Sequence, residues 1–313
     1  YVEEKMKRSK NLLRKGAALA AMSTVLVSQA PLINAFAYGE ADVSQSTFKQ
    51  DTDNSADFQN WLSNVWQGGE KAYAQTENVA LTPGSDAADL NFSWYSAGKG
   101  TPAVKVWKDG SKSSAKVVTG NEEAICAENW QGKSYSAANK VNIADYFEEN
   151  TQYHYQYTDN YTGDDSIWSA EYDYTTKATD KFSVILTGDP QVGASGSSSD
   201  YSANDASVAR DAYYWNKTMQ QALKTCPDAS FLLSAGDQIN QSGATKDNDK
   251  KTRESEYAGY LYPSVFRSLP IAATIGNHDM AGSDYSAHFN NPNSEDKLGS
   301  TAAGSDFYFN YGD

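Results

Sequence analysis

Three short polar clusters in the second half of the chain combine residue types that bind metals or transfer protons. They are Gly188-Asp189-Pro190-Gln191, Gly236-Asp237-Gln238 and Gly276-Asn277-His278-Asp279. Carboxylate and amide oxygens, together with an imidazole, suit divalent metal ions, and one carboxylate can bridge two of them. A single Gly-Asp is a common turn and carries little information. The three clusters in this order predict one shared site.

Apolar runs directly before each cluster indicate how the clusters are positioned. The expected strands are residues 181–187, 230–235, 271–275 and 306–311, and the expected helices are 207–225 and 253–268. Short β-branched runs between helices are typical of a parallel sheet that is buried on both faces. Ligand sites in such sheets lie beyond the carboxyl ends of the strands, so the clusters should converge there. The glycine before each cluster allows a sharp backbone turn.

The preceding 100 residues have a different texture. Short alternating stretches with turn signals between them predict a β-sandwich. The stretches are residues 90–95, 103–107, 140–143, 152–157 and 166–174. His154 falls on the polar side of its strand, and we interpret it as a surface residue without a metal role.

A short helix is expected over residues 55–66, where apolar residues recur at helical spacing. Its tryptophans, Trp61 and Trp66, have two interpretations. They form part of a core stripe, which we favour, or they form a surface that stacks against sugars.

The N-terminal residues resemble a targeting signal. Basic residues, an apolar run and the triplet Ala35-Phe36-Ala37 predict a secretory signal peptide over residues 1–37, cleaved after Ala37. The alternative is an anchor that stays attached. With cleavage we expect no stable membrane span and a secreted, extracellular or cell-envelope location. The low cysteine count, with only Cys126 and Cys226, favours a bacterial exported protein.

The net charge of −14 excludes one class of partner. Nucleic-acid binding needs a clustered basic surface, and we expect none. A phosphate-ester substrate remains compatible with an acidic protein, because a bound metal ion inverts the local field.

The three clusters, taken together, resemble the calcineurin-like metallophosphoesterase superfamily. Residues 77–178 are similar in texture to the fibronectin-type-III-like N-terminal domain of purple acid phosphatases. After the signal peptide (1–37) and a polar, helical lead-in (38–76), the resemblance implies the sandwich (77–178) and the N-terminal part of a metallophosphoesterase domain (179–313). The last would be an incomplete αββα sandwich in a chain truncated at its C-terminus.

The resemblance also implies roles for the clustered residues. Asp189 would ligate one metal ion, Asp237 would bridge two, and Asn277 would ligate the second. His278 would face a small phosphate-ester substrate, and Asp279 would orient its ring. A metal-bound hydroxide would attack phosphorus, with Fe, Mn, Zn or Mg as the ions. The alternatives are a phosphodiesterase or nucleotidase on the same scaffold, and a non-catalytic envelope-binding protein.

The sequence departs from the family pattern at three places. Gln191 stands where relatives have His or Gly, and it would either ligate a metal ion or hydrogen-bond to a metal-bound water. Asn240 replaces the tyrosine of purple acid phosphatases, so no purple colour is expected. The later histidine ligands are missing, because His288 lies in a connecting segment and is interpreted as a surface residue. We therefore expect the 313 residues to have little activity by themselves.

Overall fold

The computed structural model describes residues 55–67, 79–130, 132–195, 205–294, 304 and 306–312. The expected signal peptide and most of the lead-in lie outside these ranges. Residues Asp51–Asp313 form one compact unit. Among the described helices, none is both long and apolar enough to cross a membrane.

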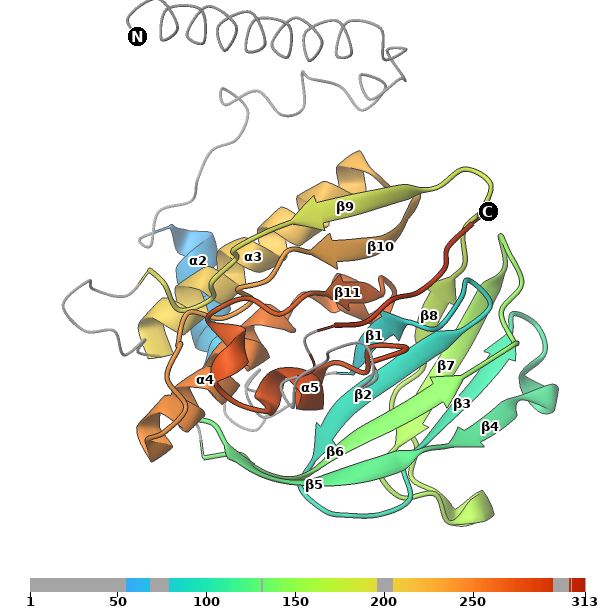
Figure 1. Cartoon of the computed structure of the whole chain (residues 1–313), viewed down its shortest axis with the longest axis horizontal. Helices are drawn as coiled ribbons and strands as arrows, with labels where there is room; N and C mark the ends of the chain where they lie inside the picture. Colours follow the sequence, from blue (N-terminus) through green and yellow to red (C-terminus); the bar gives the residue numbers. More distant parts are fainter. Residues whose placement is uncertain are drawn as a thin grey trace, which may run out of the picture. The chain divides into compact units, whose positions relative to one another are not determined.

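The first half contains two four-stranded antiparallel sheets (Figure 1). One has the order β1 (Ala80–Pro83), β2 (Leu90–Ser96), β6 (Ser134–Ile143), β5 (Asn121–Glu128). The other has the order β4 (Lys116–Thr119), β3 (Ala103–Lys108), β7 (Gln152–Thr158), β8 (Tyr172–Thr175). Phe92 of β2 and Tyr155 of β7 meet edge to face, with ring centroids 5.2 Å apart, inside the shared core. The alternating pattern therefore predicted a two-sheet architecture correctly.

The second half contains a three-stranded parallel sheet in the order β11-β10-β9. Its strands are β9 (Ser183–Thr187), β10 (Ala229–Ser234) and β11 (Ile271–Ala273). Its helices are α3 (Asp205–Thr225), α4 (Asp247–Tyr260) and α5 (Asp284–His288), with 3-10 turns η8 (Ser264–Arg267) and η9 (Asp279–Ala281). Two further 3-10 turns, η6 (Lys112–Ser114) and η7 (Gly163–Asp165), belong to the first half. The predicted order of strands and helices is confirmed, apart from the differences below.

In the second half, three predicted elements differ from the structure. The helix expected over 253–268 starts earlier and ends at Tyr260, because Pro263 disfavours helical backbone in the residue before it. Residues 306–312 form no strand; Phe309 and Tyr311 pack against the ring of Phe231 instead. The first strand is not buried on both faces, since Leu186 of β9 is 68% exposed.

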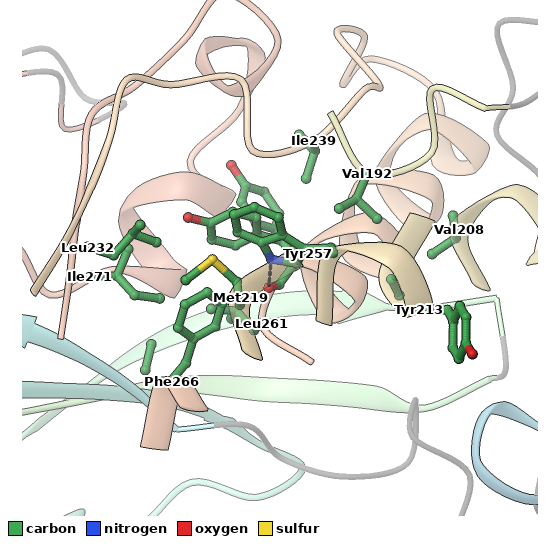
Figure 2. Packing of buried hydrophobic residues seen from close by; sticks show 14 of the residues in the cluster. Val192, Val208, Tyr213, Met219, Leu232, Ile239, Tyr257, Leu261, Phe266 and Ile271 are labelled. Carbon is green, nitrogen blue, oxygen red and sulfur yellow. Dashed lines mark hydrogen bonds between the residues drawn. The ribbon is translucent and has the colours of Figure 1, made fainter. Parts of the chain in front are cut away.

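The main core of the second half lies between the parallel sheet and helices α3 and α4. Figure 2 shows part of it, with Val208, Tyr213 and Met219 from α3, Leu232 from β10 and Ile271 from β11. The expected N-terminal helix is present as α2 (Ala56–Trp61), continued by a π-helical turn η3 (Leu62–Trp66). Ser55 caps α2 by accepting the N–H of Phe58 at 3.2 Å.

Trp61 and Trp66 belong to this core. They are 8% and 1% exposed, and the Trp61 indole N–H donates to the Tyr262 hydroxyl at 2.7 Å. Rings buried in this way have no face open to a sugar. The core interpretation is confirmed, and the sugar-stacking interpretation is wrong.

The two halves meet along a polar seam. Thr82 of β1 and Asn91 of β2 donate to the carbonyl of Asn290 at 2.7 and 2.9 Å. Asn290 in turn donates to Asn142 at 2.6 Å. These contacts explain why β2 is buried along its whole length, although its sequence alternates as if one face were in water.

His154 is more enclosed than its predicted surface position indicates. Its ring nitrogens lie 2.7 Å from Asp173 and 3.0 Å from Asp109, and the ring stacks against Trp107. Burial alone would lower the pKa of His154, but hydrogen bonds to Asp109 and Asp173 outweigh it and raise the pKa above its ordinary value.

We expect this cluster to make stability depend on pH. The folded-state pKa of His154 lies above that of the unfolded chain, about 6.5. Its contribution is therefore complete below about pH 6.5 and is lost as the pH rises through the folded pKa. Urea unfolding of the wild type at stepped pH values above about pH 5 should show this decline. The His154→Gln variant should lose that part of the dependence; equal slopes in both proteins would contradict the assignment.

Candidate metal site

The structure brings the three polar clusters together at the carboxyl ends of β9, β10 and β11. The N–H of Asp189 donates to the carbonyl of Gly236 at 3.2 Å, and the N–H of Gln191 donates to the carbonyl of Asp237 at 3.0 Å. The N–H of His278 donates to Oδ1 of Asp237 at 2.9 Å. The second cluster therefore lies between the other two and contacts both.

Two of the three glycines are required by this close approach. A Cβ at Gly276 would lie 2.0 Å from Oδ1 of Asp237, and a Cβ at Gly236 would lie 2.9 Å from Cα of Gly276. Gly236 also has a φ of +100°. Gly188 differs, because its nearest neighbour would be the Cβ of Ala235 at 3.5 Å, an ordinary contact.

The backbone at this edge of the sheet is unusual in a second way. Asp189, Gln191 and Asp237 all have positive φ angles, of 50°, 38° and 53°. Side-chain-bearing residues seldom adopt this region, and such residues gather at functional sites. Three of them in adjoining turns point to a site that is held in shape by its surroundings.

The oxygen donors differ in their exposure. Asp237 is 7% exposed, and its Oδ2 accepts a long hydrogen bond of 3.4 Å from the Gln191 amide. Asp189 and Asn277 are exposed at the outer side of the same turns. The set therefore contains one buried carboxylate, one exposed carboxylate and the amides of Gln191 and Asn277.

This donor set fits a hard divalent cation. Carboxylate and amide oxygens are the ligands that Mg²⁺ and Mn²⁺ take, and Gln191 and Asn277 add to the two carboxylates. Among the described residues, no group of three or more His, Cys, Asp or Glu is arranged to hold a metal ion. The role of Asp189, Gln191, Asp237 and Asn277 as metal ligands stays a prediction.

His278 has a defined ring orientation. Its Nδ1 hydrogen-bonds to the backbone carbonyl of Asn240. A carbonyl oxygen only accepts hydrogen bonds, so Nδ1 carries the hydrogen. Nε2 is then the ring atom left to accept a proton, or to donate one when the imidazole is charged. Asn240 contacts His278 through its backbone carbonyl. The comparison of its side chain with the tyrosine of purple acid phosphatases did not predict this contact.

Asp279 does not have the predicted role of orienting the His278 ring. Its Oδ2 accepts the N–H groups of Asp237 and Gly276, both at 2.8 Å, and its Oδ1 accepts the Tyr257 hydroxyl at 3.0 Å. Burial raises the pKa of Asp279, although these hydrogen bonds partly oppose the rise. The carboxylate therefore connects the second strand-end turn to the third by hydrogen bonds to their backbones.

Arg253 of α4 was missed by the sequence analysis and organises the same turns. Its guanidinium donates to the carbonyls of Gln241, His278 and Asp279 at 2.6, 2.7 and 2.7 Å. It also forms an ion pair with Asp284, in which Nη2 donates to Oδ1 at 2.8 Å. A charged residue in a polar helix normally lies on the face in contact with solvent. The sequence therefore contained no indication that Arg253 is buried.

His288 is not a surface residue, contrary to the prediction. Its Nε2 lies 3.0 Å from Oε2 of Glu254, and its ring stacks on Tyr95 with centroids 4.2 Å apart. It lies at the end of α5, in the seam between the halves. These contacts give it a packing role there.

Comparison with known proteins assigns no family to this chain. No protein-family model matches the chain, and no curated protein sequence matches it. A solved structure that is similar is purple acid phosphatase PPD1 from yellow lupin (Lupinus luteus) seeds. The TM-score is 0.46 at 14% identity, over 64% of this chain and 35% of that one. The chain thus spans about a third of that protein, and the family assignment stays a prediction from the motifs.

Proposed function

We propose that this protein is a metal-dependent hydrolase of phosphate esters. One observation carries the proposal: the strand-end turns place Asp237 between the other two clusters. The Asp237 carbonyl accepts the backbone N–H of Gln191, and the Asp237 carboxylate accepts the backbone N–H of His278. This arrangement gathers oxygen donors and an imidazole around one edge of a parallel sheet. Ligand sites of α/β proteins lie at such edges.

The residues have distinct proposed tasks. Asp189, Gln191, Asp237 and Asn277 would hold two divalent ions. When bound, such ions stabilise negative charge on a phosphoryl group and lower the pKa of water. His278 would direct Nε2 at the ester, donating a proton to the leaving oxygen when charged.

The wider proposal includes export and further ligands. An acid-phosphatase-like monoesterase would carry the sandwich as a fibronectin-type-III-like domain and act outside the cytoplasm after signal cleavage. Two metal ions need more ligands than these two carboxylates and two amides supply. The remaining ligands would come from a longer polypeptide, and residues 1–313 by themselves would hydrolyse substrate slowly or not at all.

Hydrolysis of p-nitrophenyl phosphate with added Mn²⁺, Mg²⁺ or Zn²⁺ tests the function. A polypeptide that continues beyond Asp313 should be active, and Asp237→Asn in it should lower the rate at least about 100-fold, because it weakens a metal-binding carboxylate. Asp228→Asn, at the opposite end of β10 and exposed, is the matched control and should change little. An inactive longer polypeptide with every metal would contradict the proposal.

A further inference from the structure

Glu256 is a buried carboxylate directly behind the candidate site. It lies in α4 and has no exposed surface. Its Oε2 accepts the backbone N–H of Asn240 at 3.0 Å and that of Gln241 at 2.7 Å. Both donors belong to the segment that follows Asp237, so Glu256 fixes the course of this segment after the second strand-end cluster.

The same segment holds the ring of His278. The carbonyl of Asn240 accepts from Nδ1 of His278, while the carbonyl of Gln241 is bound by Arg253. Glu256 therefore accepts the N–H groups of the segment, and Arg253 donates to one of its carbonyls. The acceptor of the imidazole is fixed between these two side chains of one helix.

We propose that Glu256 is a positioning residue that keeps His278 in its Nδ1–H form, with Nε2 free for the substrate. The inference rests on the proposed function only in giving His278 a role in the reaction. The chain of contacts from Glu256 through Asn240 to His278 exists whatever the reaction is.

The placement of Glu256 is unfavourable for stability, which supports a role in shaping the site. Burial raises its pKa to about 8, opposed by the N–H groups of Gln241 and Asn240. Its Oε1 has no hydrogen-bond partner among the described residues. An unsatisfied buried oxygen costs free energy that an apolar side chain would avoid.

The chain supplies a matched control at Asp211 of α3. This half-buried carboxylate also accepts two backbone N–H groups, from Gly193 at 2.8 Å and from Ser195 at 3.1 Å. Its loop follows the first strand-end cluster, and neither acceptor contact involves His278. Replacing Asp211 tests whether the loss of any carboxylate that holds a loop changes the tautomer of His278.

The experiment is ¹⁵N NMR of the imidazoles in the full chain without metal, at one fixed pH above the imidazole pKa. The wild type should show His278 with protonated Nδ1 and unprotonated Nε2. Glu256→Leu, or Glu256→Met if that variant does not fold, should shift His278 toward the Nε2–H form, because the Asn240 carbonyl is no longer held in place. Glu256→Gln keeps an acceptor for both N–H groups and should retain the wild-type pattern.

Two further variants make the result specific. Asn240→Ala should leave the His278 signals unchanged, since only the backbone of Asn240 is used. Asp211→Leu should also leave them unchanged. An Nε2–H form in the wild type, or an unchanged His278 in folded Glu256→Leu or Glu256→Met, would overturn the proposal. Because no turnover is measured, this outcome is independent of whether the protein hydrolyses phosphate esters.

Discussion

Replacing Arg253 with methionine should destabilise the protein by about 3–5 kcal/mol, the usual effect of removing one partner of a buried ion pair. The side chain of Arg253 is 1% exposed, and that of Asp284 is 12% exposed. Without the guanidinium, the Asp284 carboxylate loses its ion-pair partner and retains the backbone N–H of Tyr285 at 3.2 Å. The carbonyls of Gln241, His278 and Asp279 lose their donor at the same time. Urea unfolding of both proteins measures the change.

A double-mutant cycle separates the ion pair from the carbonyl contacts. Asp284→Leu removes the uncompensated charge, so adding it to Arg253→Met should restore part of the lost stability. The stability that is not restored would measure the contribution of the hydrogen bonds to the three carbonyls. A loss below about 1 kcal/mol in Arg253→Met would show that Arg253 does not hold the turns as described.

Gly276→Ala should disrupt the candidate metal site more than any other change of one methyl group. The new Cβ would lie 2.0 Å from Oδ1 and 2.3 Å from the backbone nitrogen of Asp237. The second atom is backbone, and Oδ1 is held by the N–H of His278, so the third turn must move away from the second. We expect the affinity for Mn²⁺ to fall by about 10–100-fold, as for other losses of support around metal ligands.

Gly188→Ala is the control for this effect. Its Cβ would meet only the Cβ of Ala235, at 3.5 Å, and its φ is not in the left-handed region. Mn²⁺ affinity, measured by electron paramagnetic resonance of the free ion, should be nearly unchanged. Equal losses in Gly188→Ala and Gly276→Ala would contradict the close packing of the second and third turns.

The sequence predicted the placement of the site because that placement depends on local patterns. Apolar runs followed by Gly-Asp or Gly-Asn-His-Asp identify strand ends, and parallel strands bring such ends to one edge. The convergence of Asp189, Asp237 and His278 follows from these facts alone. The end of α4 before Pro263 could also have been predicted, because proline disfavours helical backbone in the residue before it.

The supporting contacts were beyond prediction for a physical reason. Arg253 and Glu256 lie in a strongly polar helix, and only tertiary packing turns that face inward. The carbonyl of Asn240 has no side-chain signature at all. Asp279 follows His278 in sequence, which favoured a contact between them, but the turn directs its carboxylate at the backbone of Asp237 instead.

The exposed face of β9 was not predicted, because the amino-acid composition of a strand does not show which elements pack against it. Val184 and Leu186 are 39% and 68% exposed, although their run reads as a strand buried on both faces. On the opposite face, Ile185 packs against the main core. A β-branched run establishes the strand, while its burial depends on the layers around it.

Mn²⁺-induced broadening of the histidine ring signals tests the central claim most directly. The chain has three histidines, His154, His278 and His288, and they lie in separate places in the described structure. A paramagnetic ion bound at the strand-end turns should broaden His278 first. It should broaden His288 less, because that ring is separated from the turns by Tyr257 and Asp279, and it should leave His154 sharpest. The effect should be absent with Mg²⁺ and weakened in Asp237→Asn. Equal broadening of all three rings, or none at His278, would contradict a metal site at these turns.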